Sequence, residues 1–167
     1  MKIRVILSLC LGLCIIACGE EAAEPGATVE AAVTLANGRT VAEQIEYRKG
    51  QYKKLGGAFK TISDALKSGS PDMAAIQAAA TSVPEVTEGM VDWFPAGTGP
   101  ESGVKTGASA KIWAQPDDFA AKVTAFETAA ANLATAAATG DIGAISAAFG
   151  ATGGTCKGCH DVYKTKG

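Results

Sequence analysis

Apolar residues recur at intervals of three and four positions along most of the chain from residue 41 onward, in four separate stretches. This spacing puts them on one face of an α-helix, as in helices that pack into a bundle. The first helix is predicted over about residues 41–67, from a Thr40-x-x-Glu43 capping box to Ser68-Gly69. Its stripe comprises Val41, Ile45, Arg48, Tyr52, Leu55, Phe59, Ile62 and Leu66.

Ser70-Pro71-Asp72 predicts the start of a second helix, with Ser70 as the cap and a proline in the first turn. Its stripe comprises Met73, Ile76, Ala80, Val83, Thr87, Met90 and Phe94. Pro84 lies inside this pattern, so we expect a kink or a break there. A long loop without regular structure is predicted from Phe94 to about Ala114, and its tryptophans and phenylalanine could cover an apolar face of a ligand.

Gln115-Pro116-Asp117-Asp118 predicts the start of a third helix, which ends at Thr139-Gly140. Asp141 can cap a fourth helix that reaches almost to the end of the chain. The third stripe comprises Phe119, Val123, Phe126, Ala130, Leu133 and Ala137, and the fourth comprises Ile142, Ile145, Phe149, Thr152, Cys156, Cys159 and Tyr163. Four helices with short connections and one long loop predict an all-α, antiparallel, up-down-up-down four-helix bundle.

The first eighteen residues predict export from the cytoplasm. Lys2 and Arg4 precede an apolar core, residues 5–17, which is too short to span a bilayer and suits a signal peptide over residues 1–17. The core ends in Ile15-Ile16-Ala17-Cys18, which resembles the lipobox of bacterial lipoproteins. We therefore expect Cys18 to become the lipidated first residue, and an ordinary signal peptide that releases a free protein is the alternative.

Residues 18–38 are small, acidic and turn-prone, and they predict a flexible tether before a domain at residues 39–167. The expected location is the bacterial periplasm, with membrane contact only through the N-terminal lipid. The net charge is −2, and without the first eighteen residues 13 basic residues remain against 17 acidic ones, a net charge of −4. This charge argues against a nucleic acid partner, because phosphate binding requires a basic patch.

The sequence Cys156-Lys157-Gly158-Cys159-His160 is a C-x-x-C-H motif, the pattern at which haem is attached covalently. On a helix, positions three and four apart share a face. Cys156 and Cys159 can therefore reach the two vinyl groups along one porphyrin edge, and His160 can ligate the iron. His160 is the only histidine of the chain, so no second imidazole can complete the coordination. The expected cofactor is one covalent haem c.

Three other kinds of arrangement could also use this motif. A structural zinc site requires four Cys or His ligands, and only three are available here. A redox-active dithiol would be expected in a βαβ context, of which the pattern gives no sign. The third alternative is purely structural, with two buried cysteines beside a surface histidine. Cys10 and Cys14 lie in the predicted leader, so no disulfide framework is expected.

Two positions of the first stripe are unusual for a core. Arg48 is charged, and an unpaired buried guanidinium is very unfavourable. Haem supplies two propionates, which arginine binds in a two-pronged geometry, whereas a structural Arg48 would extend to solvent at the end of the bundle. Tyr52 follows one turn later and either lies over the iron or is a half-buried aromatic. Gly150, Gly153 and Gly154 are expected to leave room for the porphyrin, and Gly56-Gly57 to mark a close approach of a backbone or a flat ligand.

From about Gln44 to Lys166 the chain resembles the cytochrome c′ family, the four-helix class of c-type cytochromes. The residues that carry this resemblance are Tyr47-Arg48, Leu55-Gly56-Gly57, Trp93-Phe94-Pro95, Ile112-Trp113, Phe149-Gly150 and Cys156-Lys157-Gly158-Cys159-His160-Asp161-Val162-Tyr163-Lys164.

The resemblance implies a five-coordinate haem that binds nitric oxide and carbon monoxide, passes electrons to redox partner proteins and pairs as a homodimer. It implies that Arg48 binds a propionate and that Tyr52 and Phe94 form the distal pocket. Lys164 stands where many members have an arginine near the proximal histidine. A six-coordinate, low-spin sister group uses a methionine on the first helix, where this chain has none. An enzymatic role is not expected, because no distal histidine or carboxylate pair is present for acid–base chemistry.

Overall fold

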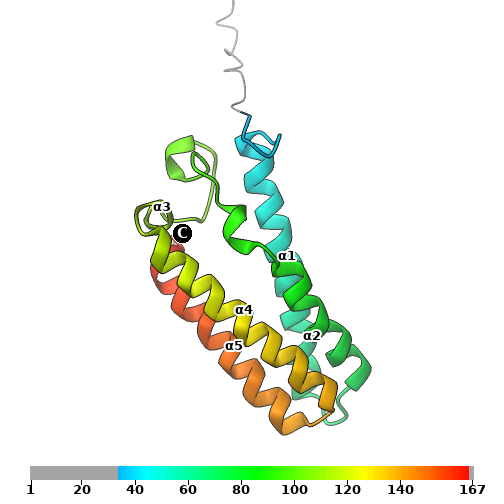
Figure 1. The fold of residues 1–167 in the computed structure, drawn as a ribbon. Helices are drawn as coiled ribbons and strands as arrows, with labels where there is room; N and C mark the ends of the chain where they lie inside the picture. The colour runs from blue at the N-terminus through cyan, green and yellow to red at the C-terminus, as the bar shows by residue number, and fades with distance from the viewer. Residues whose placement is uncertain (1–33, 166–167) are drawn as a thin grey trace, which may run out of the picture. The chain divides into compact units, whose positions relative to one another are not determined.

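The computed structural model describes residues 34–165, so the predicted export signal, Cys18 and most of the predicted tether lie outside the described residues. Four long helices dominate the described part: α1 (Val41–Lys67), α2 (Met73–Thr87), α4 (Pro116–Thr139) and α5 (Ile142–Tyr163). Three short elements lie between α2 and α4, namely η1 (Met90–Trp93), η2 (Pro100–Ser102) and α3 (Lys111–Ala114). The predicted four-helix architecture is confirmed (Figure 1).

The helices pack in the order α1, α2, α4 and α5, and each contacts its neighbour in this series. No such extensive contact joins α1 to α5. Figure 1 shows the α1–α2 pair and the α4–α5 pair close together at one end and spread apart toward the end that carries α3. Among residues 34–165, no helix is long and apolar enough to cross a membrane.

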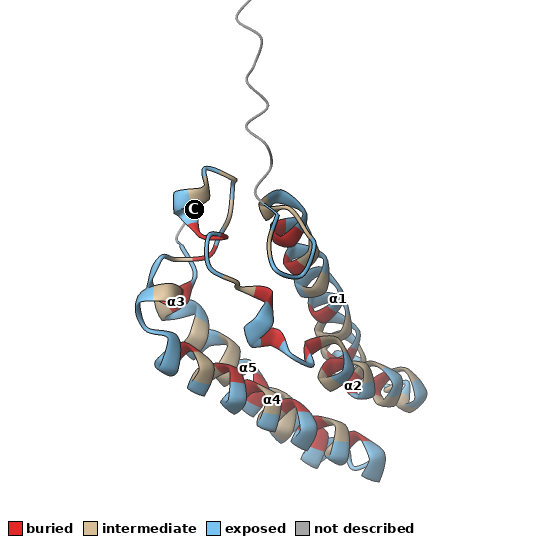
Figure 2. Ribbon diagram, turned by 45° about the horizontal axis from the view of Figure 1, so that its top comes forward, coloured by how far each residue is buried: buried red, intermediate tan, exposed pale blue. Residues whose placement is uncertain are grey.

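The core has two parts. At the closed end, fully buried aliphatic residues from all four helices interlock, including Ile62, Ile76, Leu133 and Ile145. Each such side chain contributes on the order of 2 kcal/mol of burial free energy. The second part lies toward the open end and combines aliphatic residues with the buried aromatic residues Trp93, Phe119, Phe126 and Tyr163. Figure 2 shows buried residues recurring on one side of each long helix, as the 3/4 spacing predicts.

The capping box at Thr40 and the caps at Asp141 and Gly140 are confirmed. The predicted start of the second helix was wrong by two residues, because Asp72 is the N-cap rather than Ser70. The Asp72 carboxylate accepts a hydrogen bond from the Ala75 N–H at 3.0 Å. Ser70 is engaged instead with Ser68, whose hydroxyl donates to its carbonyl.

The second helix continues through Pro84 to Thr87, so the break does not fall at the proline. It follows at Gly89, whose φ of 64° favours glycine, and the 3₁₀ turn η1 begins directly after it. The predicted loop from Phe94 to Ala114 is not structureless either, since it contains η2 and α3.

Residues 34–38, expected to end the tether, form a hydrogen-bonded turn. The Leu35 N–H donates to the Arg39 carbonyl at 2.8 Å, and the Gly38 N–H donates to the Leu35 carbonyl at 2.9 Å. The Asn37 amide also donates to the side chain of Gln44 at 2.9 Å. An Asn-Gly pair has the backbone freedom that such a turn requires.

Candidate functional site

A cavity of about 470 Å³ lies among α1, α4, α5 and the segment between α2 and α4. This volume falls in the range typical of sites for small molecules and cofactors. Its walls are largely apolar and include Leu55, Phe59, Val123 and Phe126. The fold thus contains a space that is large enough for a cofactor between these elements.

The α5 wall of the cavity carries the C-x-x-C-H motif. Cys156, Cys159 and His160 all line the cavity, as the shared helical face predicts. Both cysteines are free and half-buried, and burial raises the pKa of each thiol. Burial, with a smaller contribution from Lys164, lowers the pKa of His160. The imidazole is thereby favoured in its neutral form, which is the form that ligates a metal.

This donor set fits a covalent haem. Two thiols and an imidazole face one apolar, cofactor-sized space, so the side chains that would form the thioethers and ligate the iron are already together. The alternatives fit less well. Among residues 34–165 no cluster of histidine, cysteine or acidic residues could hold a metal ion by itself. Both cysteines also line the cavity, whereas purely structural cysteines would be packed inside the core.

The α1 wall carries Tyr52, Leu55, Gly56 and Phe59. Tyr52 is 37% exposed, and its ring packs edge-to-face on Trp93 with a centroid distance of 5.4 Å. Burial of the phenol in the cavity mouth raises the pKa of Tyr52, and the nearby Cys159 sulfur adds to this shift. The side chain is therefore a neutral phenol that can donate a hydrogen bond into the cavity.

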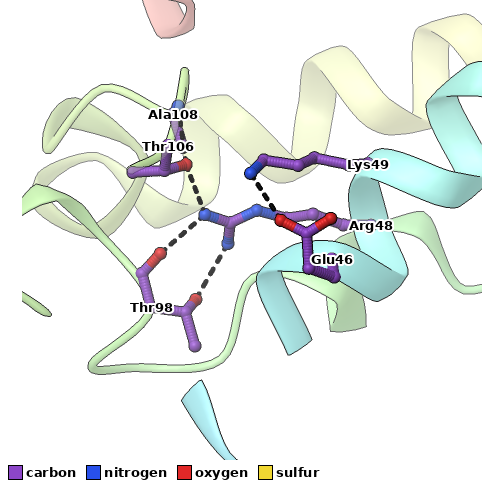
Figure 3. Close-up of polar contacts among 6 residues, drawn as sticks. All are labelled: Glu46, Arg48, Lys49, Thr98, Thr106 and Ala108. Carbon is purple, nitrogen blue, oxygen red and sulfur yellow. Dashed lines mark hydrogen bonds and ion pairs between the residues drawn. The ribbon is translucent and has the colours of Figure 1, made fainter. Parts of the chain in front are cut away.

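Arg48 closes one end of the cavity and is only 3% exposed, which excludes the alternative in which it extends to solvent. Its guanidinium donates to the Thr98 hydroxyl at 2.9 Å, to the Thr98 carbonyl at 2.7 Å and to the Thr106 hydroxyl at 2.6 Å (Figure 3). It also lies over the ring of Phe94, 5.0 Å from the centroid. Arg48 thus joins α1 to the segment that follows η1.

Phe94 lines the cavity and packs edge-to-face on Phe119 at 5.0 Å. The two tryptophans expected to cover a ligand do not line the cavity. Trp93 is buried beside α1, and the Trp113 indole N–H donates to the carbonyls of Phe94 and Pro95. They therefore support the cavity wall from behind.

Of the glycines expected beside a ligand, only Gly56 lies at the cavity. Gly56 lines the cavity, and no neighbouring chain packs against it. Gly150, Gly153 and Gly154 were expected beside the porphyrin, and this was wrong, since all three are exposed and none lines the cavity. Thr152 is the residue of that turn that faces the bundle. It is fully buried, with its hydroxyl on the carbonyls of Ala148 and Ala129.

Lys164 lines the cavity one turn after His160 and is exposed. Three residues important to the site were not identified from the sequence: Thr98 and Thr106, which hold Arg48, and Asp118. The Tyr163 hydroxyl donates to Asp118, and burial, together with this contact, raises the pKa of Tyr163 to about 12. Lone threonines in a glycine-rich segment give no pattern, whereas Asp118 was noted only as part of a helix start.

Comparison with known proteins places this site in a family. The family model for cytochrome c′ matches residues 43–164. A cytochrome c′ of Pararhodospirillum photometricum is 36% identical over 121 residues, which cover 72% of this chain and 94% of that protein. A cytochrome c-556 of Agrobacterium fabrum is 33% identical over 130 residues, which cover 75% of this chain and 83% of that protein.

Solved structures agree. A cytochrome c′ with an unusual ligand-controlled dimer dissociation superposes with a TM-score of 0.72 at 32% identity, covering 77% of this chain and 99% of the other. The nitric oxide complex of a mutant cytochrome c′ from Alcaligenes xylosoxidans superposes with a TM-score of 0.68 at 28% identity, covering 76% and 97%. Together with the motif that lines the cavity, these matches show that the chain belongs to the cytochrome c′ family and binds one covalent haem c.

Proposed function

We propose that this protein is a periplasmic haem protein whose iron is five-coordinate and high-spin, and that it binds nitric oxide or carbon monoxide. The observation that carries the proposal is the contrast between two cavity walls. The α5 wall presents His160, the only imidazole of the chain. The α1 wall presents a phenol, a leucine, a glycine and a phenylalanine, together with Arg48 and Lys49, whose charged groups are bound to the two threonines and to Glu46. The aliphatic and aromatic side chains offer no iron ligand, and a phenol with a raised pKa is a weak one.

In this proposal Tyr52 and Phe94 form the distal pocket. When bound, the haem iron supplies a site for a diatomic ligand or an exchangeable electron. Tyr52 limits access and can donate a hydrogen bond, and Phe94 keeps that side apolar. Lys164 stands on the proximal side with a single point charge, which lacks the planar geometry of arginine. Arg48 holds a haem propionate at the far end of the cavity.

Electron carriage between redox partner proteins is compatible with the same site, because a covalently held haem is retained through repeated oxidation and reduction. We propose attachment to a bacterial membrane through lipidated Cys18 and pairing as a homodimer. The relative with ligand-controlled dimer dissociation supports the last point. We do not propose an enzymatic role, because the cavity wall provides no histidine or carboxylate pair on the α1 side.

A specific observation favours a second candidate, a six-coordinate, low-spin electron-transfer cytochrome. Met90 lines the cavity, is 6% exposed and brings a thioether close to the site, although it lies in η1 rather than on the first helix. In the five-coordinate proposal, the role of Met90 is packing.

Titration of the ferrous protein with nitric oxide and carbon monoxide tests the proposal, with Met90→Leu as the paired variant. We expect saturable binding and the same resting spectrum in both proteins. A low-spin resting spectrum that becomes high-spin in Met90→Leu would favour the second candidate. A protein that binds neither gas would contradict the first.

A further inference from the structure

Arg48 has only part of its hydrogen-bonding capacity left for a carboxylate. A guanidinium has five N–H groups, and three of them are occupied by Thr98 and Thr106. Both hydrogens on Nη2 are among the three. Each two-hydrogen face of a guanidinium that can grip a carboxylate includes an Nη2 hydrogen. Arg48 therefore cannot offer a two-pronged grip while it holds both threonines.

The hydroxyl of Thr106 can donate a hydrogen bond that Arg48 cannot supply. Its hydroxyl oxygen accepts from Arg48 at 2.6 Å and from the Ala108 N–H at 3.1 Å, and both of these partners can only donate (Figure 3). Within residues 34–165 no acceptor takes the hydroxyl hydrogen of Thr106 in a hydrogen bond. Thr106 lines the same cavity as Arg48. Its O–H is thus a donor beside the guanidinium.

The end of the haem-bearing helix fixes the position of Thr106. The Thr165 N–H donates to the Gly107 carbonyl at 2.9 Å, and the Ser109 N–H donates to the Tyr163 carbonyl at 2.9 Å. Ala108 and Lys164 form an isolated antiparallel bridge between these two bonds. Because the porphyrin is attached to α5 itself, the hydroxyl and the haem edge are positioned by the same element.

Lys49 is the cation next to Arg48 in the chain, and it is engaged elsewhere. Its ammonium pairs with Glu46 at 2.7 Å, and both side chains are largely exposed (Figure 3). Arg48, by contrast, is buried and donates three hydrogen bonds to Thr98 and Thr106. Lys49 therefore does not compete with Arg48 and Thr106 for a carboxylate in the cavity.

We propose that one haem propionate is bound jointly, by a single N–H of Arg48 and by the O–H of Thr106, while Arg48 keeps its bonds to Thr98. Thr106 is then a positioning residue for the cofactor, and Thr98 positions Arg48. This inference rests on the proposed placement of a propionate at Arg48. It adds a donor that lies 58 positions away along the chain.

The test uses the haem-loaded full chain and resonance Raman spectroscopy of the propionate bending band, whose frequency depends on the hydrogen bonds that the carboxylate accepts. Thr106→Val removes the hydroxyl and keeps the shape of the side chain, and Thr106→Ser restores the hydroxyl. Thr128→Val is the matched control, because Thr128 is exposed and its hydroxyl bonds only to its own helix at Thr124. Arg48→Lys reports on the placement at Arg48.

We expect the band to shift in Thr106→Val and to stay at the wild-type frequency in Thr106→Ser and Thr128→Val. A shift in Arg48→Lys without one in Thr106→Val would overturn the joint site and leave the placement at Arg48 intact. No shift in either would overturn both. Equal shifts in Thr106→Val and Thr106→Ser would also overturn the inference, since the hydroxyl would not be the cause. If Thr106→Val yields no loaded protein, Thr106→Ala is judged by the same outcomes.

Discussion

Arg48 donates hydrogen bonds to both the hydroxyl and the backbone carbonyl of Thr98, at 2.9 and 2.7 Å, across 50 positions of the chain. Both residues are buried, so water cannot replace either hydrogen-bonding partner when the other is removed. This pair holds the segment after η1 against α1, and with it one end of the haem cavity.

Loss of this pair should destabilise the fold. Arg48→Ala leaves two buried oxygens of Thr98 without their donor, and we expect the free energy of unfolding to fall by about 3 kcal/mol. Lys49→Ala is the control, because its exposed pair with Glu46 is worth only about 0.5 kcal/mol. Urea unfolding of both haem-loaded variants measures this, and equal losses would show that Arg48 has no special role.

Tyr52 should control gas binding. If its hydroxyl donates to the bound gas, Tyr52→Phe removes one hydrogen bond, which is worth about 1 kcal/mol, and gas dissociation should accelerate by about two- to tenfold. The larger change Tyr52→Leu should alter the association rate as well, with the iron still five-coordinate.

Tyr47→Phe is the matched control for Tyr52. Its ring also packs edge-to-face on Trp93, at 6.5 Å, but it does not line the cavity. Stopped-flow and flash-photolysis rates for nitric oxide and carbon monoxide make the comparison. Unchanged rates in both Tyr52 variants would remove Tyr52 from the distal pocket.

The first turn of α1 should give a pH-dependent contribution to stability. Hydrogen bonds from the Thr40 backbone N–H and then from its hydroxyl hold the pKa of Glu43 below its ordinary value of 4.5. A depressed folded-state pKa stabilises the fold above that ordinary value, and the contribution disappears as the pH falls through the folded-state pKa. The wild type should therefore lose stability relative to Glu43→Gln on acidification.

Urea midpoints of these two proteins between pH 7 and pH 3 measure this difference. Replacing Thr40 by Val in both backgrounds should remove the smaller part of it, because the hydroxyl is lost while the backbone N–H still donates to Glu43. A difference that is unchanged in the Thr40→Val background would mean that the Thr40 hydroxyl does not contribute to the lowered pKa of Glu43.

Covalent attachment should depend on the two cysteines alone. Cys156→Ala and Cys159→Ala should each retain one thioether, and the double variant should carry no covalent haem. Thr155→Ala is the control, since Thr155 lines the cavity beside Cys156 and has no thiol that could form a thioether. The mass of each protein under denaturing conditions gives the result, and a double variant that keeps the added mass would contradict the assignment.

Local patterns predicted the helices and the attachment motif well. The stripe of α4 from Phe119 to Ala137 is buried at every predicted position, because one-sided burial imposes a strict period. The C-x-x-C-H residues meet on one face for the same geometric reason. These features depend only on neighbours within a few turns.

Features that depend on competition between two possible caps, or on partners distant in the sequence, could not be predicted in this way. Ser70 and Asp72 are both good caps, and only the folded chain selects Asp72. The threonines at positions 98 and 106 meet Arg48 through tertiary contacts, of which the local sequence carries no trace. The glycines of α5 were misplaced because a glycine has no side chain by which its side of the helix could be recognised.

The coordination state of the iron tests the central claim most directly. Electron paramagnetic resonance of the ferric protein, with resonance Raman spectra of the ferric and ferrous forms, reports both the spin state and the number of axial ligands. The account predicts a five-coordinate, high-spin iron in both oxidation states, with His160 as its protein ligand. A six-coordinate, low-spin signature in the resting protein, retained when nitric oxide is added, would contradict it.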